Sequence, residues 1–135
     1  MMVSGGLLLL LDQWSKRIAR RRLSARGLSW GAVLRLRCVQ NRTSLFRGHR
    51  SRALLVLVWC AALVAMVVLH RSGAWFQSQI AMIGLGLALG GAAGNLLDGL
   101  RDRAIVDFID LGWWPVFNVA DVAIVAGLLT AFSQR

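Results

Sequence analysis

The stretch that decides the fold is Ile80–Asp98, which reads IAMIGLGLALGGAAGNLLD. It has no charged residue before its last position, and a run of about 18 apolar residues is what a bilayer core of roughly 30 Å requires of a helix. Gly86, Gly90 and Gly94 recur at every fourth position, so they share one face of that helix. Small residues at this spacing let helices approach closely in lipid. The same row ends at Asp98, which predicts a polar group at the end of the packed face.

The rest of the chain supports a membrane protein of one domain. Hydrophobic residues make up 57% of the 135 residues and are gathered into long runs, so the bilayer rather than water is the expected solvent. A length of 135 residues leaves room for a single domain, 1–135. We predict four transmembrane helices, at residues 1–18, 53–69, 80–97 and 116–132.

The first of these spans has the weakest pattern. Its apolar run ends at Leu11, so the helix must continue past Asp12, with Lys16 and Arg17 reaching toward the membrane interface. A secretory signal peptide is the rival interpretation, but its positive residues should precede the apolar run, and here they follow it. A chain start assigned too late would also explain the short run.

An alternating segment lies between the first two spans. Leu34 and Leu36 alternate with Arg35 and Arg37 within residues 33–40, and a period of two is typical of a strand. A strand with arginines on one face and leucines on the other suits a membrane surface. Its partner would come from the same loop or from residues 105–111. The expected fold class is therefore an all-α integral membrane protein with a small extramembrane β-element between the first two helices.

The positive charge is concentrated in the same region. The net charge is +10, and twelve of the sixteen basic residues lie between Lys16 and Arg52. Anionic lipid headgroups are the nearest partner for a basic loop between two spans, so we expect membrane lipids rather than nucleic acid to bind it. The positive-inside rule would place this loop in the cytoplasm.

The carboxylates point to a functional site. All six acidic residues are Asp, and five of them lie between Asp98 and Asp121. A carboxylate within a membrane helix costs a few kcal/mol or more, so Asp121, about one and a half turns into its predicted helix, is a candidate functional group. Asn118 lies three residues earlier on the same face, and Asp107 lies in an apolar segment.

Asp107 and Asp121 could act as a pair. Two carboxyl groups at about 3 Å share one proton, which leaves one as a base for water and the other as an acid. Two structural alternatives remain. Asp107 could be a solvated loop residue and Asp121 a buried one satisfied by Asn118, or the aspartates could only balance the arginines.

Other catalytic chemistries have little support. His49 and His70 stand beside basic residues, and no serine lies in a nucleophile turn. The histidines lack metal-ligand spacing, the chain has no Glu, and Cys38 and Cys60 form no CxxC pattern. We therefore expect no metal and no organic cofactor, and we interpret both cysteines as structural.

Four blocks, in order along nearly the whole chain, resemble the motifs of lipoprotein signal peptidase, the bacterial enzyme also called signal peptidase II. Gly94–Asp98 followed by Val106–Ile109 resembles the third-helix signature of the family, and Trp114–Asp121 resembles its second catalytic block. These two are highly specific together. Asp12–Lys16 and Asn41–Phe46 are similar to the first block and to the block of the first outer loop.

The resemblance implies an aspartic endopeptidase of the bacterial cytoplasmic membrane, active near the outer leaflet without a cofactor, and we expect a monomer. Its substrate would be a prolipoprotein whose cysteine carries a diacylglyceryl group, cut just before that cysteine. The implied catalytic pair is Asp107 and Asp121. The residues implied to bind substrate or support the pair are Asn95, Asp98, Asn118, Asn41, Asp12 and Lys16.

Two alternatives remain open, and departures from the family pattern support the first of them. Gly99 stands where the family usually has Arg, and Arg103 and Thr43 stand where Gly is usual. They favour an impaired relative that binds lipidated peptides without cutting them, unless Arg101 or Arg103 supplies the missing charge. A second class is a small helical transport or assembly protein in which Asp98 and Asp121 relay protons or ions.

Overall fold

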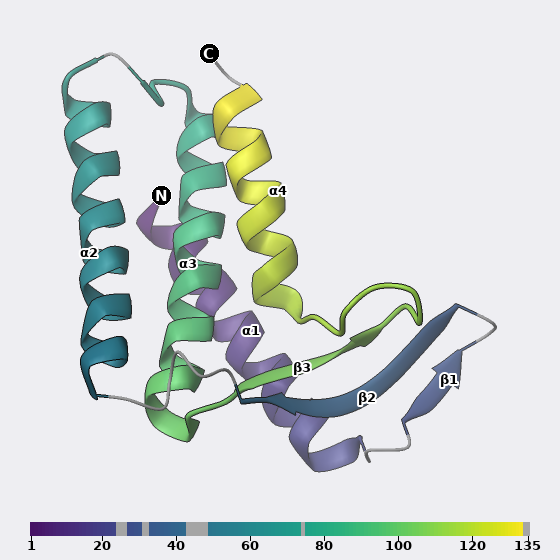
Figure 1. The fold of residues 1–135 in the computed structure, drawn as a ribbon. Coiled ribbons are helices and arrows are strands. Elements are labelled where there is room, and N and C mark those ends of the chain that lie inside the picture. The colour runs from purple at the N-terminus through teal and green to yellow at the C-terminus, as the bar shows by residue number, and fades with distance from the viewer. Residues whose placement is uncertain (24–26, 31–32, 43–48, 74, 134–135) are drawn as a thin grey trace.

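The computed structural model describes residues 1–23, 27–30, 33–42, 49–73 and 75–133. Across these residues the chain is mostly helical, with one small antiparallel sheet (Figure 1). The elements, in chain order, are α1 (Met2–Arg22), β1 (Leu28–Trp30), β2 (Leu34–Asn41), α2 (His49–Arg71), α3 (Gln79–Asp102), β3 (Ile105–Asp110) and α4 (Val119–Ser133).

The four helices meet the test for a membrane span unequally. In the described part of the chain, α3 and the Ala53–Arg71 part of α2 are long and apolar enough to cross a membrane. α4 is a shorter apolar helix of 15 residues. α1 has 21 residues and carries Asp12, Lys16 and four arginines toward its end, so it does not pass on composition. The structure thus has a helix at each predicted span, and two of them are strong candidates to cross the membrane.

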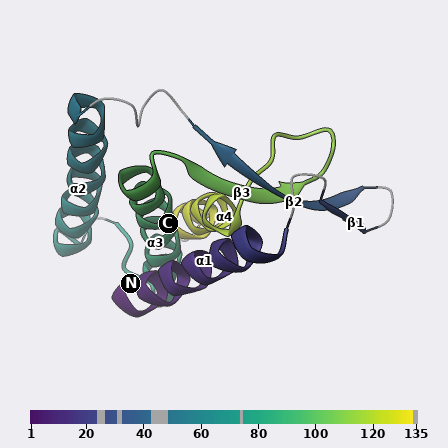
Figure 2. The same ribbon diagram turned by 90° about the horizontal axis from the view of Figure 1, so that it is seen from below.

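The helices form a group of three with a fourth beside it. α3 packs against α1 and α4, whereas the main contacts of α2 are with α3. Viewed along the bundle, α2 stands apart from α1, α3 and α4, and the sheet extends away on the other side (Figure 2). α3 is therefore the central helix of the domain.

Glycines bring α3 into close contact with both neighbours. A Cβ built at Gly90 would collide with the α1 backbone, and one built at Gly86 would collide with the Ser4 hydroxyl and the Met1 carbonyl oxygen. One built at Gly94 would lie 2.5 Å from Asp12 Oδ2. Toward α4, a Cβ at Gly84 would lie 2.6 Å from the carbonyl oxygen of Gly127. The predicted close packing along the glycine row is confirmed, and it is directed mainly at α1.

The sheet has the order β1-β2-β3, so β2 pairs with a strand from its own loop and also with β3. The sequence predicted a partner strand either in the same loop or at residues 105–111, and both of these segments pair with β2. Leu36 faces Leu28 and Ile109, while Arg35 faces Ser29 and Asp110, which confirms the separation of leucine and arginine onto opposite faces here.

A register shift between Leu36 and Val39 then brings Val39 opposite Asp107. The sheet lies at one end of the bundle, with β3 leading directly from the end of α3 (Figure 1). This connection carries Asp107 to the place where α1, α3 and α4 converge.

The start of the fourth helix was predicted too early. It begins at Val119 rather than at residue 116, because Phe117 is still extended and pairs with Ile109. The Phe117 N–H donates to the Ile109 carbonyl oxygen at 3.0 Å, so it cannot begin the helix. Asp121 consequently lies in the first turn of α4, not one and a half turns inside it.

The other predicted bounds differ at their polar ends. α1 continues to Arg22, and α3 continues to Asp102, beyond the predicted end at residue 97. α3 stops at Arg103, whose φ of 53° is in the left-handed region that favours glycine. This agrees with Arg103 standing where the family usually has Gly.

Gly127→Ala tests the glycine packing. The added methyl group would collide with the Gly84 carbonyl and lie 2.7 Å from the Ala88 nitrogen. Because both obstacles are backbone atoms, the helices must separate, at a cost of about 1–3 kcal/mol in the free energy of unfolding. Thermal unfolding in detergent measures the change.

The matched control is Gly6→Ala in α1, where a Cβ meets nothing within 4 Å. It should stabilise the helix by up to about 1 kcal/mol. Equal unfolding temperatures for the two variants would contradict close packing of α3 on α4.

Candidate active site

A cluster of buried polar side chains lies where β3 and the start of α4 meet α1 and α3. Asn118 and Asp12 have no exposed surface, Lys16 and Asp98 are 2% exposed, and Asp107 is 4% exposed. Polar groups buried to this degree are costly unless each finds a partner. Their contacts therefore define the site.

Asn118 joins the two predicted catalytic aspartates. Its Oδ1 accepts a hydrogen bond from the Asp121 backbone N–H at 3.1 Å, and Asp121 Oδ2 accepts one from the Asn118 N–H at 3.1 Å. This reciprocal pair is a capping box at the start of α4. The Asn118 Nδ2 group donates to Asp107 Oδ1 at 2.7 Å and also, at 3.3 Å, to the Val106 carbonyl oxygen. One buried residue therefore connects both carboxyl groups, through its side chain to Asp107 and through its backbone N–H to Asp121.

Sequence reasoning predicted that Asn118 would hold Asp121, but it missed the cap. An Asn followed three residues later by an acidic residue, just after Pro115, is a helix start signal. Read that way, residues 118–121 would have placed the start of α4 correctly.

Asp107 is buried on the sheet and is not a solvated loop residue, which excludes one structural alternative. Its Oδ2 accepts a long hydrogen bond of 3.4 Å from Asn41 Nδ2, so Asn41 of β2 does approach the pair as expected. Burial, and secondarily the negative charge of Asp121, raises the pKa of Asp107 from 3.8 to about 6, against the hydrogen bonds from Asn118 and Asn41 that lower it. Asp107 therefore keeps its proton up to a higher pH than an ordinary aspartate does.

Asp121 is supported from α3. Its Oδ1 accepts a hydrogen bond of 2.8 Å from Asn95 Nδ2. The Asn95 Oδ1 atom in turn accepts from Asn118 Nδ2 at 3.1 Å and from Lys16 Nζ at 2.9 Å. Asn95 thus connects the aspartate pair with a charged cluster on α1.

Lys16 is the centre of that cluster. Its Nζ lies 2.8 Å from Asp12 Oδ2 and 2.9 Å from Asp98 Oδ2. Asp12 also accepts a hydrogen bond of 3.1 Å from the Ala120 N–H, which ties α1 to the first turn of α4. The structure therefore brings Asp12, Lys16, Asn95 and Asp98 together beside the pair, with Asp12 and Lys16 forming an ion pair at i, i+4.

Two further residues of α1 belong to the cluster and were not predicted. Gln13 Nε2 donates to Asp98 Oδ1 at 3.2 Å and to the Gly94 carbonyl oxygen at 3.3 Å. Arg20 lies 2.6 Å from Asp102 and 3.8 Å from Asp98. Gln13 lies three residues before Lys16 and Arg20 four residues after it, so both share one side of the helix with Lys16, a signal that the sequence offers only once that side is known to be buried.

The positions that depart from the family pattern lie around this cluster. Gly99 is buried in α3, and Arg103 is exposed at the end of that helix. The described ion pair of Arg101 is with Asp102 at 3.9 Å, so charge beside Asp98 comes from Lys16 and Arg20 of α1. Thr43 lies outside the described residues.

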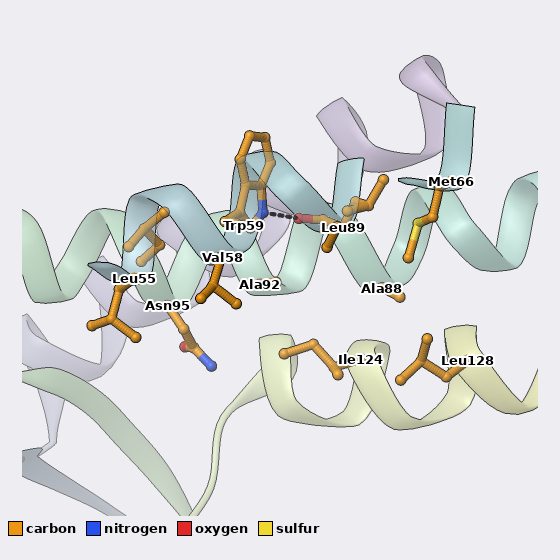
Figure 3. A pocket seen from close by; sticks show the side chains of 12 residues that line it. Leu55, Val58, Trp59, Met66, Ala88, Leu89, Ala92, Asn95, Ile124 and Leu128 are labelled. Carbon is orange, nitrogen blue, oxygen red and sulfur yellow. Dashed lines mark hydrogen bonds between the residues drawn. The ribbon is translucent and has the colours of Figure 1, made fainter. Parts of the chain in front are cut away.

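Two apolar cavities adjoin the cluster. One, of about 350 Å³, lies between α2, α3 and α4, and Asn95 is its polar corner (Figure 3). The other, also about 350 Å³, follows α4 from Trp114 and Phe117 past Asp121. Within the described ranges no three His, Cys, Asp or Glu side chains are arranged to bind a metal ion. The site thus places a linked pair of carboxyl groups between apolar openings.

Comparisons with known proteins agree on one family. A family model described as signal peptidase (SPase) II matches residues 5–134. The lipoprotein signal peptidase of Rhodococcus jostii is 36% identical over 135 residues, covering 94% of this chain and 67% of the relative. That of Syntrophomonas wolfei is 43% identical over 94 residues, covering 70% of this chain and 62% of the relative. The chain therefore spans about two thirds of the length of these relatives.

A solved structure shows the same fold. A bacterial membrane enzyme superposes with a TM-score of 0.81 over 97% of this chain and 88% of its own, at 19% sequence identity. At that identity the likeness concerns the fold alone.

The protonation of Asp107 predicts how stability depends on pH. Because its pKa in the folded protein is about 6 rather than 3.8, the folded state binds the proton more tightly than the unfolded state. The free energy of unfolding should therefore fall as pH rises from about 4 to 6, by roughly 3 kcal/mol at most. Asp107→Asn should lack this fall, as measured by unfolding at several pH values.

Asp110→Asn is the control on the same strand. A hydrogen bond from the Gly112 N–H, followed by the ion pair with Arg37, lowers the pKa of Asp110. Asp110 therefore stabilises the fold above its ordinary pKa and ceases to do so as pH falls, so the sign is opposite. An Asp107→Asn variant with the same pH slope as the unchanged chain would contradict the burial argument.

Proposed function

Because this chain belongs to the signal peptidase II family, we propose that it is a membrane-embedded aspartic endopeptidase that removes signal peptides from prolipoproteins. The substrate carries a diacylglyceryl group on a cysteine, and the peptide bond just before that cysteine is cut. The single observation that carries the proposal is the link through Asn118 between the carboxyl groups of Asp107 and Asp121.

The two aspartates divide the proton transfers. Asp107, with its pKa of about 6, supplies the protonated member. Asp121 accepts hydrogen bonds from Asn95 Nδ2 and the Asn118 N–H at the start of α4, which favour a negative charge. Asp121 is therefore the base, and Asp107 is the acid.

The reaction proceeds in two steps. Asp121 takes a proton from a water molecule, whose oxygen attacks the scissile carbonyl carbon while Asp107 gives its proton to the carbonyl oxygen. The resulting gem-diol collapses: the C–N bond breaks, Asp121 passes its proton to the leaving amine, and Asp107 regains a proton from a hydroxyl of the diol. Both carboxyl groups return to their starting states.

The cavity between α2, α3 and α4 suits an acyl chain of the diacylglyceryl group. Its lining is apolar except for Asn95, which contacts Asp121 (Figure 3). Each buried methylene contributes about 0.8 kcal/mol, so a chain seated there would hold the modified cysteine beside the pair. Because α2 packs mainly against α3, we propose that this cavity between α2, α3 and α4 opens sideways into lipid.

We place the protein in the bacterial cytoplasmic membrane as a monomer with all four helices crossing it. The sheet and the aspartate pair then lie at the outer leaflet, where lipidated substrates are found. The basic residues of the loop after α1 lie outside in this arrangement, against the positive-inside rule, and anionic lipids of the outer leaflet are their partners. No contact described above favours the transport alternative.

Cleavage of a diacylglyceryl-modified prolipoprotein by the purified protein tests the activity. Asp107→Asn and Asp121→Asn should each reduce kcat by about 10³-fold or more, because each removes one of the two proton carriers. Asp110→Asn is the matched control, since Asp110 pairs with Arg37 rather than with the catalytic pair, and it should cleave normally.

The outcomes separate the alternatives. A chain that binds the substrate but never cuts it is the impaired relative favoured by Gly99, Arg103 and Thr43. A conductance or proton flux that requires Asp121 but not Asp107 would support the transport class instead.

Ala92→Phe tests the acyl-chain cavity. Ala92 lines the cavity in α3, and a phenyl ring there would fill much of it, so KM should rise about tenfold with little change in kcat. Leu97→Phe is the control on the same helix, because Leu97 is 44% exposed and does not line the cavity. Equal KM values for the two variants would place the acyl chain elsewhere.

A further inference from the structure

The buried Lys16 uses all of its hydrogen-bonding capacity. An ammonium group has three donors and no acceptor, and Nζ has three oxygens within 2.9 Å, from Asp12, Asp98 and Asn95. Two of these partners are carboxylates, which already balance the charge. The third is a neutral amide, so charge pairing alone does not explain it.

The contact with Lys16 fixes the orientation of the Asn95 amide. Because Lys16 can only donate, the Asn95 oxygen must face it, and the amide nitrogen must then point the other way. That nitrogen donates to Asp121 Oδ1 at 2.8 Å. If the amide turned over, its oxygen would face Asp121 and repel the carboxylate. The Asn118 Nδ2 group, which donates to the same Asn95 oxygen at 3.1 Å, acts in the same direction.

We propose that Lys16 is a positioning residue: by holding the Asn95 oxygen, it turns the Asn95 nitrogen toward Asp121 and so keeps Asp121 ready to accept a proton from water. The inference rests on the proposed function. Asp12 and Asp98 serve it by pairing with the charge of Lys16 inside an apolar bundle, where an unpaired ammonium would be costly.

The charged groups around Asp121 come from several elements. β3 contributes Asp107, α3 contributes Asp98, and α1 contributes Asp12, Lys16 and, further out, Arg20. A substitution at Lys16 changes this field as well as the orientation of the amide. The experiment must therefore separate the loss of a charge from the loss of a hydrogen bond.

Lys16→Met and Lys16→Gln make this separation. Both remove the positive charge, but only glutamine can still donate to the Asn95 oxygen. In Lys16→Met we expect kcat to fall about tenfold or more and the acid limb of the rate against pH to move, because the hydrogen bond that turns the Asn95 nitrogen toward Asp121 is lost. In Lys16→Gln the limb should move clearly less. Arg17→Met, at an exposed neighbouring position, should match the unchanged chain.

Infrared difference spectra without substrate give an independent readout. The carboxylate band that disappears in Asp121→Asn identifies Asp121, and its frequency should change in Lys16→Met, because the hydrogen bond from Asn95 to this carboxylate is lost. Failure of the unchanged chain to cleave would count against the proposed function, while this band would still test the inference.

Equal shifts in Lys16→Met and Lys16→Gln would overturn the inference, since charge alone would then explain them. If Lys16→Met does not fold, Asn95→Leu takes its place, because it removes the donor to Asp121 and leaves Lys16 paired with both carboxylates. An acid limb in Asn95→Leu at the position of the unchanged chain would also overturn it.

Discussion

The structure depends on placing Lys16, a charged group, among apolar helices. An ammonium 2% exposed is tolerable only with partners, and Asp12 and Asp98 supply them from α1 and α3. These ion pairs require the two helices to approach closely. Gly94 permits this, since a Cβ there would lie 2.5 Å from Asp12 Oδ2. The glycine row and the buried ion pairs therefore depend on each other, because both lie on the face of α3 that packs against α1.

From that cluster, polar contacts extend in one direction to the reacting groups. Lys16 binds the Asn95 oxygen, Asn95 binds Asp121, and Asn118 binds both Asp121 and Asp107. Each member is held by at least one neighbour from another element. Such a network is rigid because leaving any buried member unpaired costs more than its hydrogen bonds contribute. A water molecule activated between the aspartates would meet groups already oriented for proton transfer.

The surroundings of the pair suit a substrate that is itself partly lipid. The cavity bounded by α2, α3 and α4 is apolar up to Asn95, and a second one passes Trp114 and reaches Asp121. Hydrolysis requires a water molecule at the pair, whereas an acyl chain binds most favourably where water is excluded. In the arrangement proposed above, the sheet at the end of the bundle meets both requirements, because it brings Asp107 beside the start of α4, whose residues line an apolar cavity (Figure 1).

The sequence by itself determined the membrane class, the four helices and the alternating strand, and it singled out the candidate carboxylates, because periodicity and the cost of charge in lipid are local properties of the chain. Only the tertiary structure decided where α4 begins, since the pairing of Phe117 with Ile109 delays it. It also decided that Gln13 and Arg20 join the cluster, and that Asn118 reaches Asp107. These contacts join residues far apart in the chain, so no local pattern specifies them.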